Sequence, residues 1–384
     1  MTDNYYKIGD YISVIDNRNT DGSITRLMGI SIDKCYIPSV ANVIGTDLNN
    51  YKVIRKGQFA CSLMQVSRDQ RIPIAMYEDD APAIMSPAYV MFEVSHPDEL
   101  LPEYMELWFK RAEFDREASF YAVGGVRGSL DWEDFCKMEL PVPPLSEQRK
   151  IVRDYQVITD RIELLRKEND TLIELVKTLY ANCFSEGDYP HIPMSQICSK
   201  IGSGATPRGG KDSYCEEGIS LIRSTNVYDY SFSYNDLAHI NEDQAKALSN
   251  VIVEPYDVLF NITGVSIARC CMVPPNVLPA RVNQHVMILR PIAGKYMSYY
   301  LLMTMCEQSN KNLLLGIGQS GSTREAINKQ EMEDFKISLP SKEEISAFGE
   351  QAEICFGQIQ CVTQEMEILQ SMQKLMLAQI HEVM

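Results

Sequence analysis

The stretches LPVPPLSEQRKIV (residues 140–152) and ISLPSKEEISAF (residues 337–348) decide the fold of this sequence. Each ends a domain-sized region of alternating apolar and polar residues. Each also opens a long amphipathic helix, expected at about residues 147–183 and 342–383. The same order of features thus occurs twice, with a period of about 195 to 200 residues. Such an internal duplication predicts a pseudo-symmetric molecule.

The two predicted helices carry apolar residues at alternating intervals of four and three, sustained over about four heptads. That is the spacing of a coiled-coil seam, whereas a helix packed only on its own domain rarely needs so long and narrow a seam. Each seam has one polar interruption, Asn169 in the first helix and Gln373 in the second. We expect these two residues to fix the register of the helices.

Glycine and proline within residues 184–193 (FSEGDYPHIP) end the first helix. A long helix that leaves one domain and another that returns from the next favours antiparallel pairing. The sequence therefore predicts an α+β molecule of two pseudo-symmetric mixed α/β domains joined by two long helices in an antiparallel coiled coil. The predicted parts are a first domain at 1–146, a helix at 147–183, a second domain at 184–341 with a linker at 184–193, and a second helix at 342–384.

Each predicted domain contains alternating apolar segments that indicate strands, separated by Gly, Pro and Asp. The segments fall in the same order in both halves. They are Arg26–Ile32, Tyr51–Met64, Ile72–Tyr77 and Ala88–Val94 in the first half, and Ile219–Ser224, Val251–Phe260, Ala268–Val273 and Val286–Arg290 in the second.

The formal net charge of -16 argues against a free-standing nucleic-acid binder, because such proteins are usually basic. Two matching segments oppose this trend. Leu48–Tyr77 has five basic residues and one acidic residue, and Val258–Cys306 has four basic residues and no acidic one. Local positive potential there would attract phosphate. Scattered surface charge is the alternative interpretation.

The chain has no run of about 18 apolar residues and no basic start followed by an apolar stretch. We therefore expect a cytoplasmic protein without a membrane segment. The eleven cysteines are scattered, and none has the spacing of a zinc site. We expect reduced thiols that are mostly buried.

Sequence patterns that suggest chemistry fail on spacing. Gly204–Lys211 (GATPRGGK) is similar to a phosphate loop, but its first Gly is one place early and Asp212 replaces the magnesium-binding Ser or Thr. The Pro143-Pro144 pair lacks the Asn or Asp that precedes it in amino-methyltransferases. His239 and His285 are expected to be structural. The sequence predicts no catalytic residue, no bound cofactor and no metal site.

The combination of segments resembles the specificity (S) subunits of type I restriction-modification enzymes, over essentially the whole chain. The segments that carry the resemblance are PPLSEQRKIV (143–152), IGSGATPRGGKDSY (201–214), ISLIRSTNV (219–227), VIVEPYDVLFNITG (251–264), RVNQHVMILRP (281–291) and GQSGSTREAINKQEMEDFKISLP (318–340). No single motif is specific, but their order around two coiled-coil helices is.

The resemblance implies a non-catalytic subunit whose two domains are target recognition domains, each docking on double-stranded DNA and reading one half of a split, asymmetric target. The helices would set the spacing and dock two methyltransferase (M) subunits, with restriction (R) subunits joining the complex. S-adenosylmethionine, ATP and magnesium would act on those partners. The second segment, LPSKEEIS, departs from the Pro-Leu-x-Glu-Gln form of residues 144–148, which suggests an altered M-subunit surface. An S-like scaffold that binds M subunits with little DNA affinity is the alternative.

Candidate DNA contacts are Arg, Asn, Gln, Lys, Ser and Thr residues on predicted loops, because these side chains reach base edges and phosphates. Turn formation and solvated surface charge are the alternative roles. The candidates are Asn17, Arg18, Asn19, Arg26, Arg68, Arg71, Arg127 and Ser129 in the first half, and Thr206, Arg208, Lys211, Arg223, Ser224, Thr225, Asn226, Gln319, Ser320, Ser322, Thr323 and Arg324 in the second.

Overall fold

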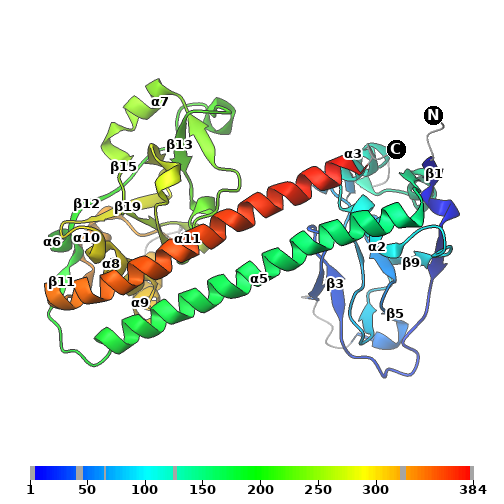
Figure 1. Cartoon of the computed structure of the whole chain (residues 1–384), viewed down its shortest axis with the longest axis horizontal. Coiled ribbons are helices and arrows are strands. Elements are labelled where there is room, and N and C mark those ends of the chain that lie inside the picture. Colours follow the sequence, from blue (N-terminus) through cyan, green and yellow to red (C-terminus); the bar gives the residue numbers. More distant parts are fainter. Residues whose placement is uncertain (1–4, 40–45, 65, 124–127, 321–325, 381–384) are drawn as a thin grey trace. The chain divides into compact units, whose positions relative to one another are not determined.

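The computed structural model describes residues 5–39, 46–64, 66–123, 128–320 and 326–380 (Figure 1). The chain divides into two compact units: unit 1 comprises residues 1–162 and 369–384, and unit 2 comprises residues 163–368. The division crosses both long helices, so each unit combines a mixed domain with a segment of each helix. The boundaries predicted from sequence separate helices from domains instead, and they stay a prediction.

Unit 1 is built from short strands and helices around one antiparallel four-stranded sheet. The elements are β1 (Tyr5–Lys7), β2 (Ile12–Ile15), β3 (Met28–Ile30), β4 (Tyr36–Pro38), β5 (Lys52–Ile54), β6 (Phe59–Cys61), α1 (Val66–Asp69), β7 (Ile74–Met76), β8 (Ala83–Met85), β9 (Val90–Val94), α2 (Pro102–Phe109), α3 (Ala112–Tyr121), α4 (Trp132–Lys137) and β10 (Glu139–Pro141). The sheet has the order β2-β9-β6-β7, and β1–β10, β3–β4 and β5–β8 form separate pairs. Phe59, Phe92 and Phe109 join the sheet to α2 in the core.

Unit 2 repeats this plan. Its elements are β11 (His191–Pro193), α6 (Met194–Ile197), β12 (Cys198–Ser203), β13 (Ile219–Ile222), β14 (Ala238–Ile240), α7 (Glu242–Ala247), β15 (Ile252–Val253), β16 (Val258–Asn261), β17 (Cys270–Met272), β18 (Ala280–Val282), β19 (Val286–Pro291), α8 (Lys295–Cys306), α9 (Gln308–Ser320), α10 (Lys329–Asp334) and β20 (Lys336–Ser338). One sheet has the order β12-β19-β16-β17, a second has the order β14-β13-β18-β15, and β11 pairs with β20.

The pairing pattern of the strands is the same in both units. The sheet β2-β9-β6-β7 corresponds to β12-β19-β16-β17, and the pair β1–β10 corresponds to β11–β20. A parallel contact recurs as well: Leu27 bridges Ile84 in unit 1, and β13 runs parallel to β18 in unit 2. The predicted α+β fold with two pseudo-symmetric halves is therefore confirmed.

Two predicted strands are each divided by a turn. The segment Tyr51–Met64 forms β5 and β6 because the chain turns at Gly57, whose φ is 81°. The segment Val251–Phe260 forms β15 and β16, with Tyr256 at a φ of 68° between them.

The long helices α5 (Leu145–Phe184) and α11 (Lys342–Gln379) pack together in opposite directions, as predicted (Figure 1). In unit 1, Gln373 Nε2 donates to Thr159 Oγ1 at 2.8 Å, and in unit 2, Gln358 Nε2 donates to Glu168 Oε1 at 3.4 Å. Most predicted seam residues are buried or half-buried, but Cys183 is exposed. In the described part of the chain, no helix combines the length and apolarity needed to cross a membrane.

The two Pro-bearing segments start their helices in different ways. Gln148 is fully buried: its Oε1 accepts from Leu101 N at 2.8 Å, and its Nε2 donates to Glu99 O and Pro143 O at 2.7 Å. In the corresponding place of α11, Glu344 accepts from the Ser341 amide and hydroxyl at 2.9 and 2.6 Å and caps its own helix. The hydrogen bonds from Ser341 lower the pKa of Glu344. The departure of LPSKEEIS from the Pro-Leu-x-Glu-Gln form was interpreted as an altered M-subunit surface. At the position of Gln148, however, the difference lies in the interior of unit 1.

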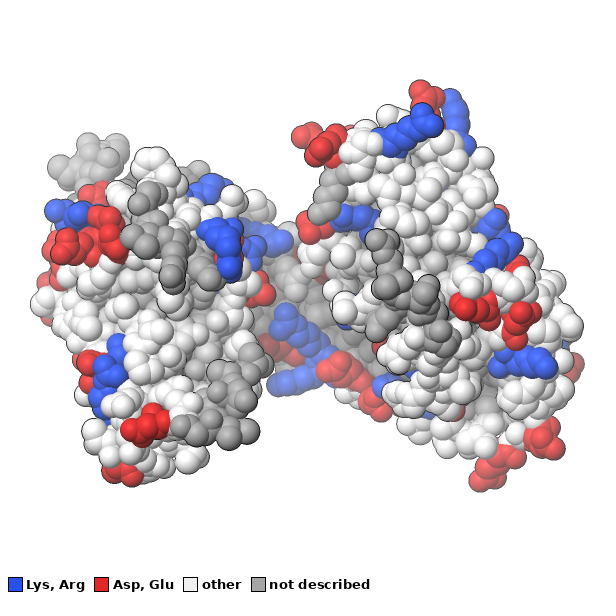
Figure 2. All heavy atoms as spheres, turned by 180° about the vertical axis from the view of Figure 1, so that it is seen from behind, with Lys and Arg blue, Asp and Glu red and all other residues white. Residues whose placement is uncertain are grey.

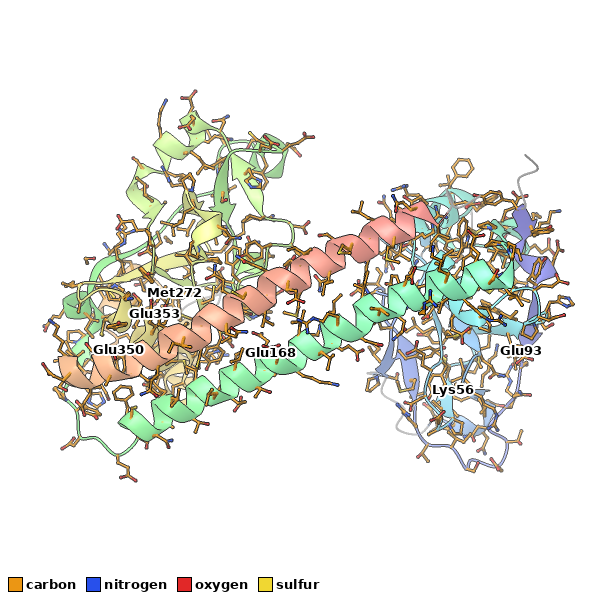
Figure 3. The ribbon with its side chains drawn as sticks, viewed as in Figure 1. Lys56, Glu93, Glu168, Met272, Glu350 and Glu353 are labelled. Carbon is orange, nitrogen blue, oxygen red and sulfur yellow. The ribbon has the colours of Figure 1, made fainter. Side chains whose placement is uncertain are left out.

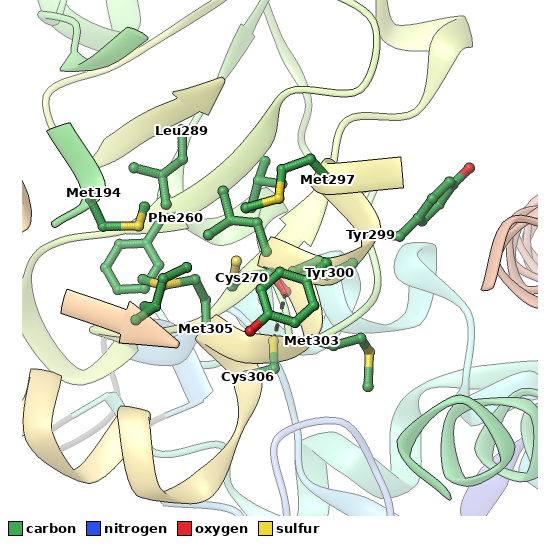
Figure 4. Close-up of a cluster of buried hydrophobic side chains, with 14 of the residues drawn as sticks. Met194, Phe260, Cys270, Leu289, Met297, Tyr299, Tyr300, Met303, Met305 and Cys306 are labelled. Carbon is green, nitrogen blue, oxygen red and sulfur yellow. Dashed lines mark hydrogen bonds between the residues drawn. The ribbon is translucent and has the colours of Figure 1, made fainter. Parts of the chain in front are cut away.

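The core of unit 2 is rich in methionine (Figure 4). Met297, Met303 and Met305 of α8 pack among the aromatic and aliphatic side chains of the sheet β12-β19-β16-β17. Tyr300 Oη donates to Ser338 O of β20 at 2.6 Å, and Tyr180 Oη of α5 lies 2.9 Å from Thr304 Oγ1. These bonds hold α8 between β20 and the long helix α5.

A corresponding ion pair in each unit has reversed charges. In unit 1, Lys34 in the turn between β3 and β4 pairs with Asp115, the fourth residue of α3, at 2.8 Å. In unit 2, Asp229 in the connection between β13 and β14 pairs with Lys311, the fourth residue of α9. Lys34 is 6% exposed, and its burial lowers the pKa despite the Asp115 charge. Each unit thus joins this turn to this helix by an ion pair, but the positions of the lysine and the aspartate are exchanged between the units.

Candidate nucleic-acid interface

Several strand ends of unit 2 meet at one edge, where polar loops emerge. Ser203 at the end of β12 is paired with Met287, and Asn261 at the end of β16 is paired with Val286. The parallel pairing of Ile222 with Val282 brings the ends of β13 and β18 to the same edge. We call the exposed and half-buried groups here the strand-end surface of unit 2. It comprises Thr206, Arg208, Arg223, Thr225, Tyr228, Thr263, Arg269, Gln284 and His285.

The predicted DNA-contacting segments of unit 2 come together at this surface. Gly204 N donates to Asn283 O at 3.0 Å, and Asn283 N donates to Ile222 O, also at 3.0 Å. A side chain at Gly204 would stand 1.8 Å from Val282 O, so this contact requires glycine. Ile327, just after the late polar loop, donates its N–H to Ile262 O at 2.9 Å. The three loops therefore occupy one side of the unit, although they are distant in sequence.

A chain of polar side chains runs across the strand-end surface. Thr206 Oγ1 donates to Gln284 Oε1 at 2.5 Å, and Gln284 Nε2 lies 2.9 Å from His285 Nε2. His285 Nδ1 lies 2.7 Å from Thr263 Oγ1. Sequence reasoning missed Thr263 and Gln284 and interpreted His285 as structural. The only signal for Gln284 and His285 was the short RVNQHV segment between two apolar strands.

The arginines of this surface lack carboxylate partners among the described residues. Arg208 is exposed. Arg223 donates to Asp236 O and lies 5.7 Å from the Tyr214 ring, while its Nε is buried without a hydrogen-bond partner. Arg269, which the candidate set did not include, lies 4.8 Å from the centre of the half-exposed Tyr228 ring. Positive charge at this edge is therefore not neutralised within the described protein.

Not every candidate of unit 2 is available at the surface. Asn226 is fully buried: its Oδ1 accepts from Arg223 N at 3.0 Å and its Nδ2 donates to Ser233 O at 3.0 Å. It holds a turn and cannot reach DNA from there, which corrects the prediction. Thr225 and Gln319 are exposed and Ser224 is half-buried. Lys211 lies in a short 3-10 helix and Ser320 is the last residue of α9, but nothing is described of their side chains. Ser322, Thr323 and Arg324 lie outside the described residues.

The candidate arginines of unit 1 are all ion-paired where they are described. The N···O distances are 2.8 Å for Arg18–Asp16, 2.6 Å for Arg26–Asp79, 2.7 Å for Arg68–Asp69 and 2.9 Å for Arg71–Asp33. Hydrogen bonds from Arg18 and Arg68 lower the pKa of Asp16 and Asp69, so these pairs stay charged at neutral pH. These four candidate arginines of unit 1 are thus already neutralised.

An edge corresponding to that of unit 2 exists in unit 1. Ile15 at the end of β2 pairs with Met91, and Cys61 at the end of β6 pairs with both Val90 and Ile74. Asn17 and Arg18 lie two and three residues after the end of β2 at Ile15. Leu130, next to the half-buried Ser129, donates its N–H to Leu63 O at 2.9 Å, so the late loop lies there too.

Two candidates of unit 1 do not belong to this edge. Asn19 is 2% exposed, and its amide bonds the main chain of Ile24 at 2.9 and 3.2 Å, so it holds a turn. Arg26 pairs with Asp79, which follows the opposite end of β7. Arg127 lies outside the described residues.

The two basic segments noted in the sequence do not form positive patches. Arg281 is 9% exposed and donates to main-chain oxygens, and Arg290 bonds the buried Asp257 at 2.7 and 2.8 Å. Burial raises the pKa of Asp257, although Arg290 acts in the opposite direction. Lys295 pairs with Glu353, labelled in Figure 3, at 2.8 Å. Figure 2 shows isolated basic groups beside acidic ones and wide uncharged areas, as the interpretation of scattered charge predicts.

The two polar seam residues differ in their hydrogen bonds. Gln373 bonds Thr159, whereas Asn169 Oδ1 is buried without a hydrogen-bond partner. Their role in fixing the register stays a prediction. Within the described ranges, no group of three or more His, Cys, Asp or Glu side chains is arranged to hold a metal ion.

Comparison with known proteins identifies the family. The family model described as the type I restriction modification DNA specificity domain matches residues 43–174 and 194–366. The type I restriction enzyme MjaVIII specificity subunit of Methanocaldococcus jannaschii is 20% identical over 266 residues, which are 64% of this chain and 61% of that protein. The chain thus aligns with about three fifths of that relative.

A solved structure agrees at the level of the fold. The crystal structure of a type I restriction-modification system S subunit from M. genitalium has a TM-score of 0.59 at 12% identity, with 98% of this chain and 95% of that chain covered. The HsdS subunit of Thermoanaerobacter tengcongensis has a TM-score of 0.36 at 16% identity, with 99% and 96% covered. Because the family model matches each half separately and over most of the chain, this protein belongs to the type I restriction modification DNA specificity domain family.

Proposed function

We propose that this chain is a non-catalytic DNA-recognition subunit whose two units read different halves of a split, asymmetric target. The main support is that corresponding edges carry different side chains. The edge of unit 2 presents Arg208 and Gln284, whereas the edge of unit 1 presents Asn17 and the 56% exposed Met64. A shared framework with different exposed groups suits two different half-sites, because base readout depends on which donors, acceptors and apolar groups face the groove.

Partner subunits supply much of the DNA affinity in this proposal. The ion-paired arginines of unit 1 can exchange carboxylate for phosphate at little cost, since exposed pairs contribute only about 0–1 kcal/mol. However, each exchange leaves a carboxylate near the DNA. We therefore propose that two methyltransferase subunits enclose the duplex, that restriction subunits join them, and that S-adenosylmethionine, ATP and magnesium act on those partners.

The long helices set the distance between the half-sites and dock the methyltransferase subunits. At about 1.5 Å per residue, the 40 residues of α5 extend about 60 Å. Exposed apolar residues recur on the helices at multiples of seven: Ile354, Ile368 and Leu375 on α11, and Val157 and Leu164 on α5. Such spacing returns to one side of a helix, as a further helical partner requires.

Replacing residues of this stripe tests the docking. Ile354→Glu and Ile368→Glu would weaken co-purification with the methyltransferase subunit, because each places a charge in an apolar contact. Leu313→Glu in α9 is the matched control, since Leu313 is 60% exposed but lies off both long helices. Equal retention of the partner by all three variants would exclude this surface.

Co-expression with the methyltransferase subunit, followed by mapping of modified bases, tests the recognition function. A split motif with one adenine methylated on each strand is the expected result. The neutralised arginines of unit 1 and the charge of -16 favour one alternative: an S-like scaffold that binds methyltransferase subunits with little DNA affinity. A stable complex without sequence-specific methylation would support the scaffold and contradict the recognition role.

A further inference from the structure

We infer that Gln284 reads an adenine in the half-site of unit 2, held in position by Thr206 and His285. This inference rests on the proposed function and specifies one contact within it. Gln284 is exposed in the connection between β18 and β19, at the place where the three polar loops of unit 2 converge. Arg208 and Arg269 on the same surface have no carboxylate partner among the described residues, so they are free for the phosphates on either side.

The hydrogen bonds of Gln284 tie its amide to His285 and Thr206. An amide nitrogen only donates, so His285 Nε2 must accept, and the imidazole proton resides on Nδ1. That proton faces Thr263 Oγ1 at 2.7 Å. The amide oxygen accepts from Thr206. With the amide turned over, its oxygen would accept from His285 Nε2–H and its nitrogen would donate to Thr206 Oγ1, so the amide again uses one donor and one acceptor.

The hydrogen bonds within the protein use half of the hydrogen-bonding capacity of the Gln284 amide. A carboxamide has two N–H donors and two acceptor lone pairs, and one of each is used by His285 and Thr206. One donor and one acceptor remain for a ligand. Bidentate recognition of adenine uses the same combination, because the base offers N7 as acceptor and its N6 amine as donor in the major groove.

The other bases fit this pattern less well. Guanine presents two acceptors, N7 and O6, so the free oxygen of Gln284 would face an acceptor. Cytosine presents a donor only, and thymine presents an acceptor beside a methyl group, so one half of the amide would stay unpaired. The corresponding connection of unit 1, Ser86–Tyr89, contains Pro and Ala in place of Gln and His. The contact is therefore a property of unit 2 alone.

The test uses the chain assembled with its methyltransferase subunits and maps the methylated motif. Gln284→Ala should lower the preference for adenine at one position of one half-site by about 5- to 150-fold, the range of a bidentate pair. Gln284→Glu should move that preference toward cytosine, whose amine donates to a carboxylate. Gln196→Glu is the matched control, because Gln196 is exposed in α6 at the opposite end of β12. It should leave the motif unchanged.

Positioning by Thr206 is tested separately. Thr206→Val keeps the shape but removes the hydroxyl, so discrimination at the same position should fall, and Thr206→Ser should restore it. A motif unchanged by Gln284→Ala and Gln284→Glu, or a change at a base other than adenine, would overturn the inference. If the unaltered complex methylates no split motif, the proposed function itself fails, which is a different result.

Discussion

At the scale of single residues, Gln148 connects the start of α5 to the loop before α2. It makes three hydrogen bonds to main-chain groups from a fully buried position. Gln148→Ala leaves the amide of Leu101 and two carbonyl oxygens without partners. We expect unit 1 to lose about 2–3 kcal/mol of unfolding free energy, the cost of unsatisfied buried groups. Urea unfolding measures the change.

A second glutamine of the same helix provides the control for Gln148. Gln156 is exposed and bonds only Asp160 of its own helix, at 2.7 Å. Gln156→Ala should change stability by no more than about 0.5 kcal/mol. Similar losses for both variants would mean that the buried bonds of Gln148 contribute no more than a surface contact.

Asp257 and Glu254 contact the same arginine from different environments. The Asp257 side chain is fully buried and Arg290 bonds both its oxygens, whereas Glu254 is 55% exposed at 2.5 Å from Arg290. Asp257→Ala leaves a cation without its main partner and should cost about 3–5 kcal/mol. Glu254→Ala should cost about 1 kcal/mol or less. Thermal unfolding of both variants checks the contrast, and equal losses would contradict it.

Residue type alone did not separate DNA candidates from structural residues. Asn19 and Asn226 have suitable side chains for base contact, yet both are buried in turns. Arg26 and Arg71 find carboxylates at Asp79 and Asp33, which are 53 and 38 residues away in the sequence. Such pairings depend on which strands lie side by side, so no local pattern predicts them.

At the scale of elements, the polar residues of the helical seam differ in how they are satisfied. Asn169 Oδ1 is buried without a partner, whereas Gln373 bonds Thr159. Asn169→Leu should stabilise the chain by about 1–2 kcal/mol, because it removes an unsatisfied polar group. Gln373→Leu should gain less, since it also removes a bond across the seam. Urea unfolding distinguishes the two variants, and destabilisation by Asn169→Leu would contradict the interpretation.

The long helices were predictable, and part of the sheets was not. The seam of α5 and α11 repeats over many turns, so its period is unambiguous in the sequence. Strands such as β2, β8 and β18 have three or four residues, too few for an alternation to stand out. The internal repeat helped to predict a strand only where both halves of the sequence kept an apolar segment, as at β9 and β19.

At the scale of the whole molecule, net charge sets the expected behaviour of the isolated chain. With -16 overall and few unpaired arginines at the described edges, we expect weak DNA binding without partners. Three phosphate contacts would give a slope of about -3 in log K against log salt. Fluorescence anisotropy with the target duplex, with and without methyltransferase subunits, measures the affinity and its salt dependence. Tight specific binding by the purified chain at physiological salt would contradict this prediction.

The ion pairs Lys34–Asp115 and Asp229–Lys311 also bear on how such a gene can be altered. A chain that joined the turn of one unit to the helix of the other would place Lys34 against Lys311, or Asp229 against Asp115. Two like charges in a partly buried place oppose folding. A crossover within the codons of α5 or α11 keeps each turn with its own helix. An exchange of a whole unit would therefore keep its ion pair intact, whereas an exchange inside a unit would carry a cost.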